Sequence, residues 1–177
     1  MLFFITGNSH KFSEIHEIIP QLERLNLAVD EIQSLDPKAV IEHKLSQAAS
    51  QHDGDFIVED TSLNLDCLNG LPGTFIKFFE QELGAAGLAK LVLHYPNHTA
   101  RVSTTIGYRP SSGDIQYFTG HYTGQIVSPR GSSGFGFDPI FLADGQAQTN
   151  AELTQAQKTA LSARGIAARK LAAHLAA

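Results

Sequence analysis

The chain has little of several things that would assign it to a class at once. Its single cysteine, Cys67, cannot form an internal disulfide or a thiolate metal cluster. No stretch approaches the roughly 20 apolar residues of a membrane-spanning helix, and the N-terminal segment lacks the basic start of a signal peptide. The net charge is −5 without a Lys/Arg cluster, so the electrostatic footprint of a nucleic-acid binder is missing. These absences favour a cytoplasmic protein that binds neither membranes nor nucleic acids.

What is present fits one globular domain over residues 1–177, because no linker, repeat or low-complexity tract divides the chain. Apolar or alternating runs predict strands over residues 2–6, 25–32, 55–59, 102–108, 115–127 and 139–142. Helical spacing predicts helices over 12–19, 37–51 and 76–95, the last broken near Gly84 and Gly87. Strands alternate with helices early and form a hairpin later, so we expect a mixed α/β sheet.

The alanine-rich C-terminal segment favours helix but poses a question of continuity. Thr154 and Gln157 fit a capping box that starts a helix. If that helix ran unbroken, Lys158 and Ser162 would share a face and Arg164 would point away from them. A break with Ser162 as a second N-cap would bring the three together and expose backbone donors to an anion. The sequence leaves both arrangements open.

A Thr-Gly-Asn-Ser-His-Lys turn lies between the first strand and the first helix. Gly7 lets the backbone approach a ligand, and a helix N-terminus together with Lys11 supplies positive potential for phosphate. The second glycine that a Walker loop carries before its lysine is absent. The same residues also suit an ordinary turn capped by Asn8.

Two adjacent acids, Glu59 and Asp60, end the predicted strand that begins at Asp55. Ligands in open α/β sheets collect at the carboxyl ends of strands, and a cation there would compensate both charges. Glu31, in the predicted strand 25–32, becomes a third oxygen ligand if the two strands are neighbours. A turn with solvated acids explains the pattern equally well.

Glycines and aromatic residues alternate in the loop Gly134–Pro139. A flat base could stack on the Phe135 ring while Asp138 accepts hydrogen bonds from its edge. The alternative is a glycine turn with phenylalanines in the core, which is the favoured reading for Phe137. Lys158 and Arg164 suit triphosphate oxygens, although both also fit a solvated helix face.

In this order the motifs resemble those of the inosine/xanthosine triphosphate pyrophosphatases. The matching segments extend over nearly the whole chain: Thr6-Gly7-Asn8 with Lys11, Glu31-Ile32-Gln33, Glu59-Asp60-Thr61-Ser62, Leu71-Pro72-Gly73 with Ile76-Lys77, Gly134 to Pro139, Ala151-Glu152-Leu153, and Lys158 with Ser162 and Arg164. The Gly134–Pro139 loop and the Leu-Pro-Gly segment are the most specific of these.

The resemblance implies an elongated mixed sheet with two lobes and a central nucleotide cleft, usually in a homodimer. The implied reaction is Mg²⁺-dependent hydrolysis of ITP, dITP and XTP to the monophosphate and pyrophosphate. Asp60 and Lys11 would be catalytic, with Asp60 orienting or deprotonating the attacking water. Mg²⁺ would bind Glu31, Asp60 and Glu59. Substrate contacts are expected from Thr6, Gly7, Asn8, Lys11, Lys44, Thr61, Lys77, Phe135, Gly136, Phe137, Asp138, Lys158 and Arg164.

Two departures from the family pattern bear on function. Ala163 stands where the family usually has a histidine that faces the nucleotide. The alternatives are therefore a member with shifted specificity or a nucleotide-binding relative with little turnover. Ala39 replaces a glutamate that bacterial members commonly carry, and Glu42 on the same predicted helix is a candidate substitute ligand.

Overall fold

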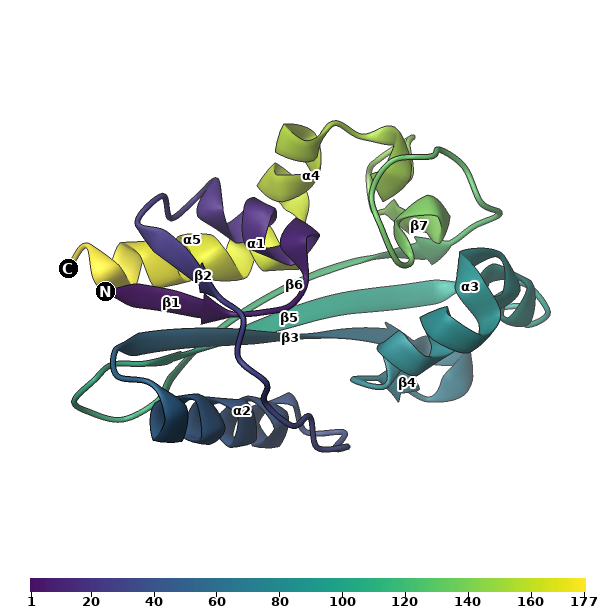
Figure 1. Ribbon diagram of the computed structural model, residues 1–177. Helices are drawn as coiled ribbons and strands as arrows, with labels where there is room; N and C mark the ends of the chain where they lie inside the picture. The colour runs from purple at the N-terminus through teal and green to yellow at the C-terminus, as the bar shows by residue number, and fades with distance from the viewer.

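The computed structural model describes all 177 residues, and their backbone is organised around one seven-stranded mixed sheet (Figure 1). The strands are β1 (Leu2–Ile5), β2 (Leu22–Leu25), β3 (Asp55–Leu65), β4 (Pro72–Gly73), β5 (Thr99–Arg109), β6 (Gln116–Ile126) and β7 (Phe141–Ala143). Their order is β2-β1-β3-β5-β6-β7, with β4 paired to β3. β1 runs parallel to β2 and β3, and every other pair is antiparallel. The predicted mixed α/β class is confirmed.

Five helices flank the sheet: α1 (Ser9–His16), α2 (Pro37–Gln51), α3 (Ile76–Val92), α4 (Gln155–Leu161) and α5 (Ala163–Leu175). Short 3₁₀ turns cover Asp66–Leu68, Asp138–Ile140 and Asn150–Glu152. Figure 1 shows α2 on one face of the sheet and α1 with α5 on the other, while α3 lies at the far end. None of the helices combines the length and the apolar character needed to cross a bilayer.

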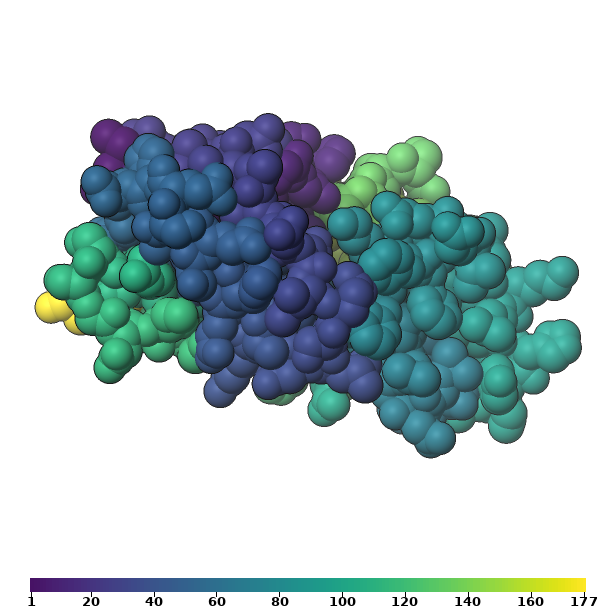
Figure 2. Space-filling view, turned by 60° about the horizontal axis from the view of Figure 1, so that its bottom comes forward, coloured from purple at the N-terminus to yellow at the C-terminus, as the bar shows by residue number.

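The molecule is elongated because its core is divided along the long strands. Apolar side chains under α1 and α5 form one cluster, and those under α2 form another on the opposite face of the same end. A third cluster lies at the other end, beneath α3 and beside β7. β3 contributes residues to all three clusters, so it connects the two ends. In Figure 2 the segment around α2, in blue, meets α3, in teal, along a furrow.

The predicted strand over residues 25–32 is wrong. The edge strand β2 ends at Leu25, and the following residues cross the molecule without pairing to the sheet. Side chains of α2 satisfy their backbone instead, since Gln47 Oε1 accepts from Asp30 N at 2.6 Å and Gln51 Nε2 donates to Ala28 O at 3.2 Å. Glu31 therefore lies in a loop and not at a strand end.

Other boundaries differ less. β3 continues six residues past Glu59, which places the two acids in mid-strand, and the predicted strand 139–142 splits into a 3₁₀ turn and β7. α3 is interrupted at Gly84 (φ 63°, ψ 173°), as predicted, whereas Gly87 is helical. α2 spans the predicted residues 37–51, and the predicted hairpin is formed by β5 and β6.

The chain breaks between α4 and α5 at Ser162, whose ψ of 153° is extended. Ser162 Oγ accepts a hydrogen bond from Gly165 N at 3.1 Å, so the residue caps α5. Thr154 and Gln157 form the predicted capping box at the start of α4. A Cβ at Gly165 would lie 1.8 Å from Thr159 O, so the corner requires glycine there.

Candidate active site

A cavity of about 770 Å³ lies between the two ends of the sheet. Its walls come from the β1–α1 turn, the loop after β2, the middle of β3, the start of α3, the Gly134–Pro139 loop and the α4–α5 corner. The volume is in the range of small-molecule sites. Apart from the candidate ligand Glu42, the site residues predicted from the sequence line this cavity, although they come from positions between Thr6 and Arg164.

The β1–α1 turn lines the cavity and is held by its own side chains. Asn8 Oδ1 accepts from His10 N at 2.9 Å and from Lys11 N at 3.2 Å, so it caps α1. Thr6 Oγ1 accepts from Asn8 N at 3.1 Å. Arg24 of β2 donates to the carbonyls of Thr6 and Gly7 at 3.0 and 2.6 Å and thereby fixes the turn from outside. The sequence patterns did not single out Arg24, because an arginine in an edge strand normally faces solvent.

Glu59 is buried and surrounded by cations. It forms ion pairs with Lys11 and with Arg164 Nε, the latter at 3.3 Å, and Thr61 Oγ1 donates to it at 2.9 Å. Burial alone would raise the pKa of this carboxyl, but the charges of Arg164 and Lys11 outweigh it and lower the pKa to about 2. The charges of Glu59 and Glu14 hold the pKa of Arg164 above its ordinary value, although burial opposes them. Glu59 is therefore a permanent anion at neutral pH.

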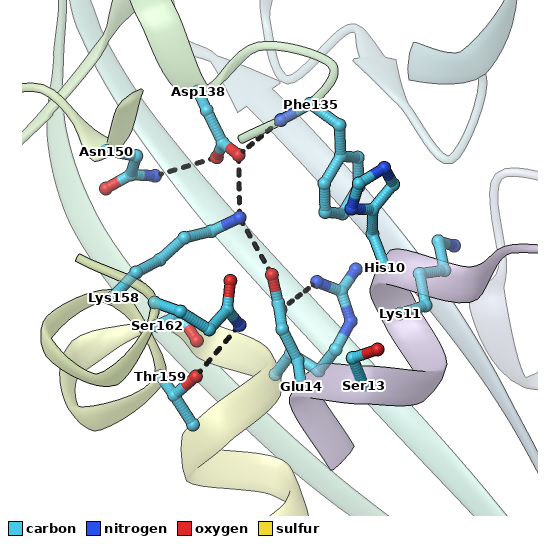
Figure 3. Close-up of polar contacts among 12 residues, drawn as sticks. His10, Lys11, Ser13, Glu14, Phe135, Asp138, Asn150, Lys158, Thr159 and Ser162 are labelled. Atoms are coloured by element: carbon cyan, nitrogen blue, oxygen red, sulfur yellow. Dashed lines mark hydrogen bonds and ion pairs between the residues drawn. The ribbon is translucent and has the colours of Figure 1, made fainter. Parts of the chain in front are cut away.

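Glu14 of α1 is a second buried acid, and it joins α1 to the α4–α5 corner. Its oxygens lie 2.8 Å from Lys158 Nζ and 2.5 Å from Arg164 Nη1, and Lys158 reaches on to Asp138 Oδ2 at 2.6 Å (Figure 3). Burial would raise the pKa of Glu14, but the two cations lower it below its usual range. Sequence reasoning missed Glu14, since a glutamate in an amphipathic helix usually lies on the exposed face. The break at Ser162 brings Lys158 and Arg164 to the same acid.

Asp60 is a buried acid of the cavity that forms no ion pair. It is 7% exposed, and its Oδ2 is buried without a hydrogen-bond partner. Burial and the neighbouring Glu59 charge raise its pKa to about 7, against the opposing effect of Lys44 and Lys11. A carboxyl with this pKa exchanges protons readily at neutral pH.

Glu31 and Glu42 are both held by other side chains. Glu31 lies between Lys44 Nζ at 2.9 Å and Lys77 Nζ at 3.4 Å. No group of three His, Cys, Asp or Glu side chains is placed to hold a metal ion. Glu42 does not line the cavity. Its Oε1 accepts a hydrogen bond from the Tyr117 hydroxyl at 2.5 Å.

The Gly134–Pro139 loop holds the Phe135 ring over the cavity. Gly134 and Gly136 have φ of 78° and 62°, and Phe135 N donates to Asp138 Oδ2 at 2.8 Å. Phe137 packs against the core beside Phe141, which is the packing role favoured from the sequence. Asp138 is buried and also receives Lys158, so it organises the loop.

Glu80 of α3 is a further lining residue that the sequence did not reveal. Its Oε1 would lie 2.6 Å from a Cβ at Gly136, so this glycine lets the loop approach the carboxylate closely. Burial raises the pKa of Glu80, and Lys11 opposes that effect. A single glutamate early in a helix carried no signal in the sequence.

Comparison with known proteins decides the family. Residues 2–174 match the sequence profile of the Ham1 family. The chain belongs to the Ham1 family. It is 36% identical over 174 residues to the inosine triphosphate pyrophosphatase of Schizosaccharomyces pombe, a match that covers 96% of this chain and 92% of that protein. It is 39% identical over 174 residues to the inosine triphosphate pyrophosphatase of Pyricularia oryzae, covering 96% and 90%.

The Ham1 fold is also recognisable from structure. The Staphylococcus aureus Ham1 protein superposes with a TM-score of 0.84 at 24% identity, covering 98% of this chain and 97% of that one. The architecture is thus retained where sequence identity is low. The family resemblance inferred from the motifs is confirmed for this Ham1 chain.

Proposed function

We propose that the protein hydrolyses the non-standard purine nucleoside triphosphates ITP, dITP and XTP to the monophosphate and pyrophosphate. The observation that carries this proposal is the cavity itself, in which five Lys and Arg side chains and the β1–α1 turn surround the Phe135 ring. The proposal is further supported by two relatives named inosine triphosphate pyrophosphatase, which match over nearly their whole length.

The cations of the cavity suit a polyphosphate. Lys11, Lys44, Lys77, Lys158 and Arg164 are five of the 13 Lys and Arg residues, and all five line it. In the structure their partners are acids, and phosphate oxygens would replace or share these partners, because each phosphate oxygen needs a donor or a counter-ion. The Thr6 hydroxyl and the Asn8 side-chain amide add donors next to the α1 N-terminus. Phe135 offers the base a stacking surface.

A magnesium ion fits the donor chemistry around Asp60. Its buried, unpartnered oxygen is the kind of ligand that Mg²⁺ prefers, and Glu31 is a partly exposed acid that lines the same cavity. We propose that these two residues hold the ion, while Glu59 stays with Lys11 and Arg164. When bound, Mg²⁺ would offset charge on the leaving pyrophosphate.

The chain's own groups account for the proton transfer. A water oxygen attacks the α-phosphorus. The bond between this phosphorus and the oxygen that bridges the α- and β-phosphates breaks, and pyrophosphate leaves with the bonding electron pair. The water proton passes to the carboxylate of Asp60, whose Oδ2 is not committed to any side chain of the protein. Lys11 stabilises the negative charge that develops on phosphate oxygens.

A second candidate function is hydrolysis with altered base preference. Ala163 is 1% exposed, lines the cavity and offers no side-chain hydrogen bond where the family resemblance leads us to expect a histidine. A site that lacks a base-specific donor discriminates less between purines.

We further propose that the protein is a homodimer and that it is located in the cytoplasm. Sedimentation would test the oligomeric state, and cell fractionation would test the location.

The test is a panel of ITP, XTP, dITP, GTP and ATP with Mg²⁺, scored for pyrophosphate release. Preference for ITP and XTP supports the leading function, a flat profile supports altered preference, and binding without release refutes turnover. Asp60→Asn is expected to abolish release while the melting curve stays close to that of the wild type. Retained activity in this variant would remove Asp60 from the mechanism.

A further inference from the structure

The two faces of the Phe135 ring are both covered by side chains. The Lys158 ammonium lies over the ring, 4.5 Å from its centroid. The His10 imidazole stacks on it with a centroid separation of 5.2 Å and an interplanar angle of 21°. In Figure 3 His10 and Lys158 flank the ring, with Lys158 rising from α4 and His10 from α1. Arg164 also lies over the ring, with its Cζ 5.6 Å from the centroid, but it is held by Glu14 and Glu59. A base that stacks on Phe135 therefore has to displace Lys158 or His10.

Lys158 is not free to move. It is 5% exposed and is held by Asp138 Oδ2 at 2.6 Å and by Glu14 Oε1 at 2.8 Å. Breaking such buried ion pairs leaves uncompensated charges, which is costly. The face of Phe135 that Lys158 covers is therefore closed to a ligand.

His10 is bound far more weakly. Its side chain is exposed and its ring makes no hydrogen bond, so the stacking contact with Phe135 is what orients it. A planar base between two rings needs about 3.5 Å on each side, or roughly 7 Å in all. Moving the His10 ring outward by about 2 Å supplies this space, and rotation of an exposed side chain accomplishes such a shift.

We propose that His10 is a substrate-binding residue that forms an aromatic clamp with Phe135, and that the nucleotide base inserts between the two rings. This inference rests on the proposed function, since it assigns the second face of the base. His10 also lies one residue before Lys11 in the phosphate-binding turn. The clamp thus places the base and the phosphates of one nucleotide against the same helix end.

Three substitutions separate stacking from polar contacts. His10→Ala removes the ring, His10→Phe keeps an aromatic ring without its nitrogens, and His10→Lys supplies a cation without a ring. Base–aromatic stacking is worth about 1–3 kcal/mol, and the alanine variant should lose the lower part of that range because Phe135 remains. We expect the KM for ITP to rise about five- to tenfold in His10→Ala and His10→Lys. For His10→Phe we expect a change of less than about twofold, with kcat little altered in all three.

The chain provides a matched control on the same helix. His16 stacks on Phe12 at 5.0 Å with an interplanar angle of 22°, but neither residue lines the cavity. His16→Ala loses an equivalent stack and its hydrogen bond to Leu22 O, so it should lower the melting temperature and leave the KM unchanged. An effect of His16→Ala on KM equal to that of His10→Ala would refute the clamp.

Binding of α,β-methylene-ITP, measured by calorimetry, decides the matter without turnover. Tight binding to the wild type and to His10→Phe, with weaker binding to His10→Ala and His10→Lys, supports the clamp. Equal affinities of the wild type and the three variants for the analogue would overturn the clamp. Wild-type affinity in His10→Lys together with weak binding in His10→Phe would also overturn it. If the wild type binds the analogue but releases no pyrophosphate from ITP, the proposed function fails. The affinities of the His10 variants for the analogue would still test the clamp in that case.

Discussion

Gly165→Ala is the substitution whose effect the structure specifies most directly. Alanine in the first turn of a helix is normally favourable by about 0.5–1 kcal/mol relative to glycine. Here the added Cβ would lie 1.8 Å from the carbonyl oxygen of Thr159 and 2.9 Å from its carbonyl carbon. Both are backbone atoms of α4, so no side-chain rotation relieves the contact. We expect α4 to move away from α5.

The required movement can be translated into free energy. Reaching ordinary van der Waals separation takes about 1.5 Å. Lys158 is on α4, and its ammonium bonds at 2.6 Å to Asp138 and 2.8 Å to Glu14 would stretch with the helix. Overpacking typically costs about 1–3 kcal/mol, and a weakened charge-assisted bond adds about 1–2 kcal/mol. These costs sum to about 2–5 kcal/mol, and subtracting the gain of alanine in a helix leaves a net loss of about 1–4.5 kcal/mol. A loss of this size lowers Tm by roughly 2–18 °C in a chain of this length.

Thermal melting followed by circular dichroism measures this loss, and ITP turnover measured well below Tm reports the displaced Lys158. Gly87→Ala is the matched control, because Gly87 is helical in α3 and its added Cβ would meet only the Leu83 side chain, at 3.1 Å. That variant should differ from the wild type by less than about 1 kcal/mol. If Gly165→Ala melts at or above the wild-type temperature, the reasoning about the α4–α5 corner is refuted.

Three further outcomes follow from the buried charges and the loop. Glu14→Gln leaves Lys158 and Arg164 short of one negative charge and should cost about 3–5 kcal/mol in urea unfolding; a loss below 1 kcal/mol would contradict this. Glu59 has a pKa lowered from 4.5 to about 2, so it contributes stability above pH 4.5 that is lost as the pH falls to 2, about 3 kcal/mol in all. A Glu59→Gln variant with the same acid slope as the wild type would argue against it. Phe135→Ala should raise the KM for ITP about tenfold or more, and an unchanged KM would exclude stacking.

Local patterns predicted the elements whose partners are close in sequence. Helix α2 and the β5–β6 hairpin followed from periodicity and turn residues. The sequence left open whether the chain breaks at Ser162, and the structure shows the break. The loop after β2 was misassigned for a reason that no local pattern contains. Gln47 and Gln51 of α2 satisfy its backbone, which lets it stay extended without a sheet neighbour.

The site residues likewise divide into those predictable from a local motif and those whose partners are distant in the sequence. Residues in compact motifs, such as those around Asn8 and Phe135, were predicted to reach the ligand and do line the cavity. Glu14, Arg24 and Glu80 were missed, because each is an isolated charged residue whose partners are distant in the chain. Nor did the sequence indicate that Glu59 is committed to Lys11 and Arg164, since pairing in mid-strand depends on where α1 and α5 pack.

The length of β3 and β5 has a consequence for how the cavity admits a nucleotide. Each strand has 11 residues, about 35 Å of extended backbone, and they are paired in register from Phe56 opposite Arg109 to Leu65 opposite Ala100. Any hinge between the two ends of the molecule would have to bend this ladder and break its hydrogen bonds. The long paired strands therefore hold the two ends of the molecule, and the cavity walls that they carry, as one rigid frame. A ligand is accommodated by rearrangement of side chains and loops around this frame and not by bending of the sheet.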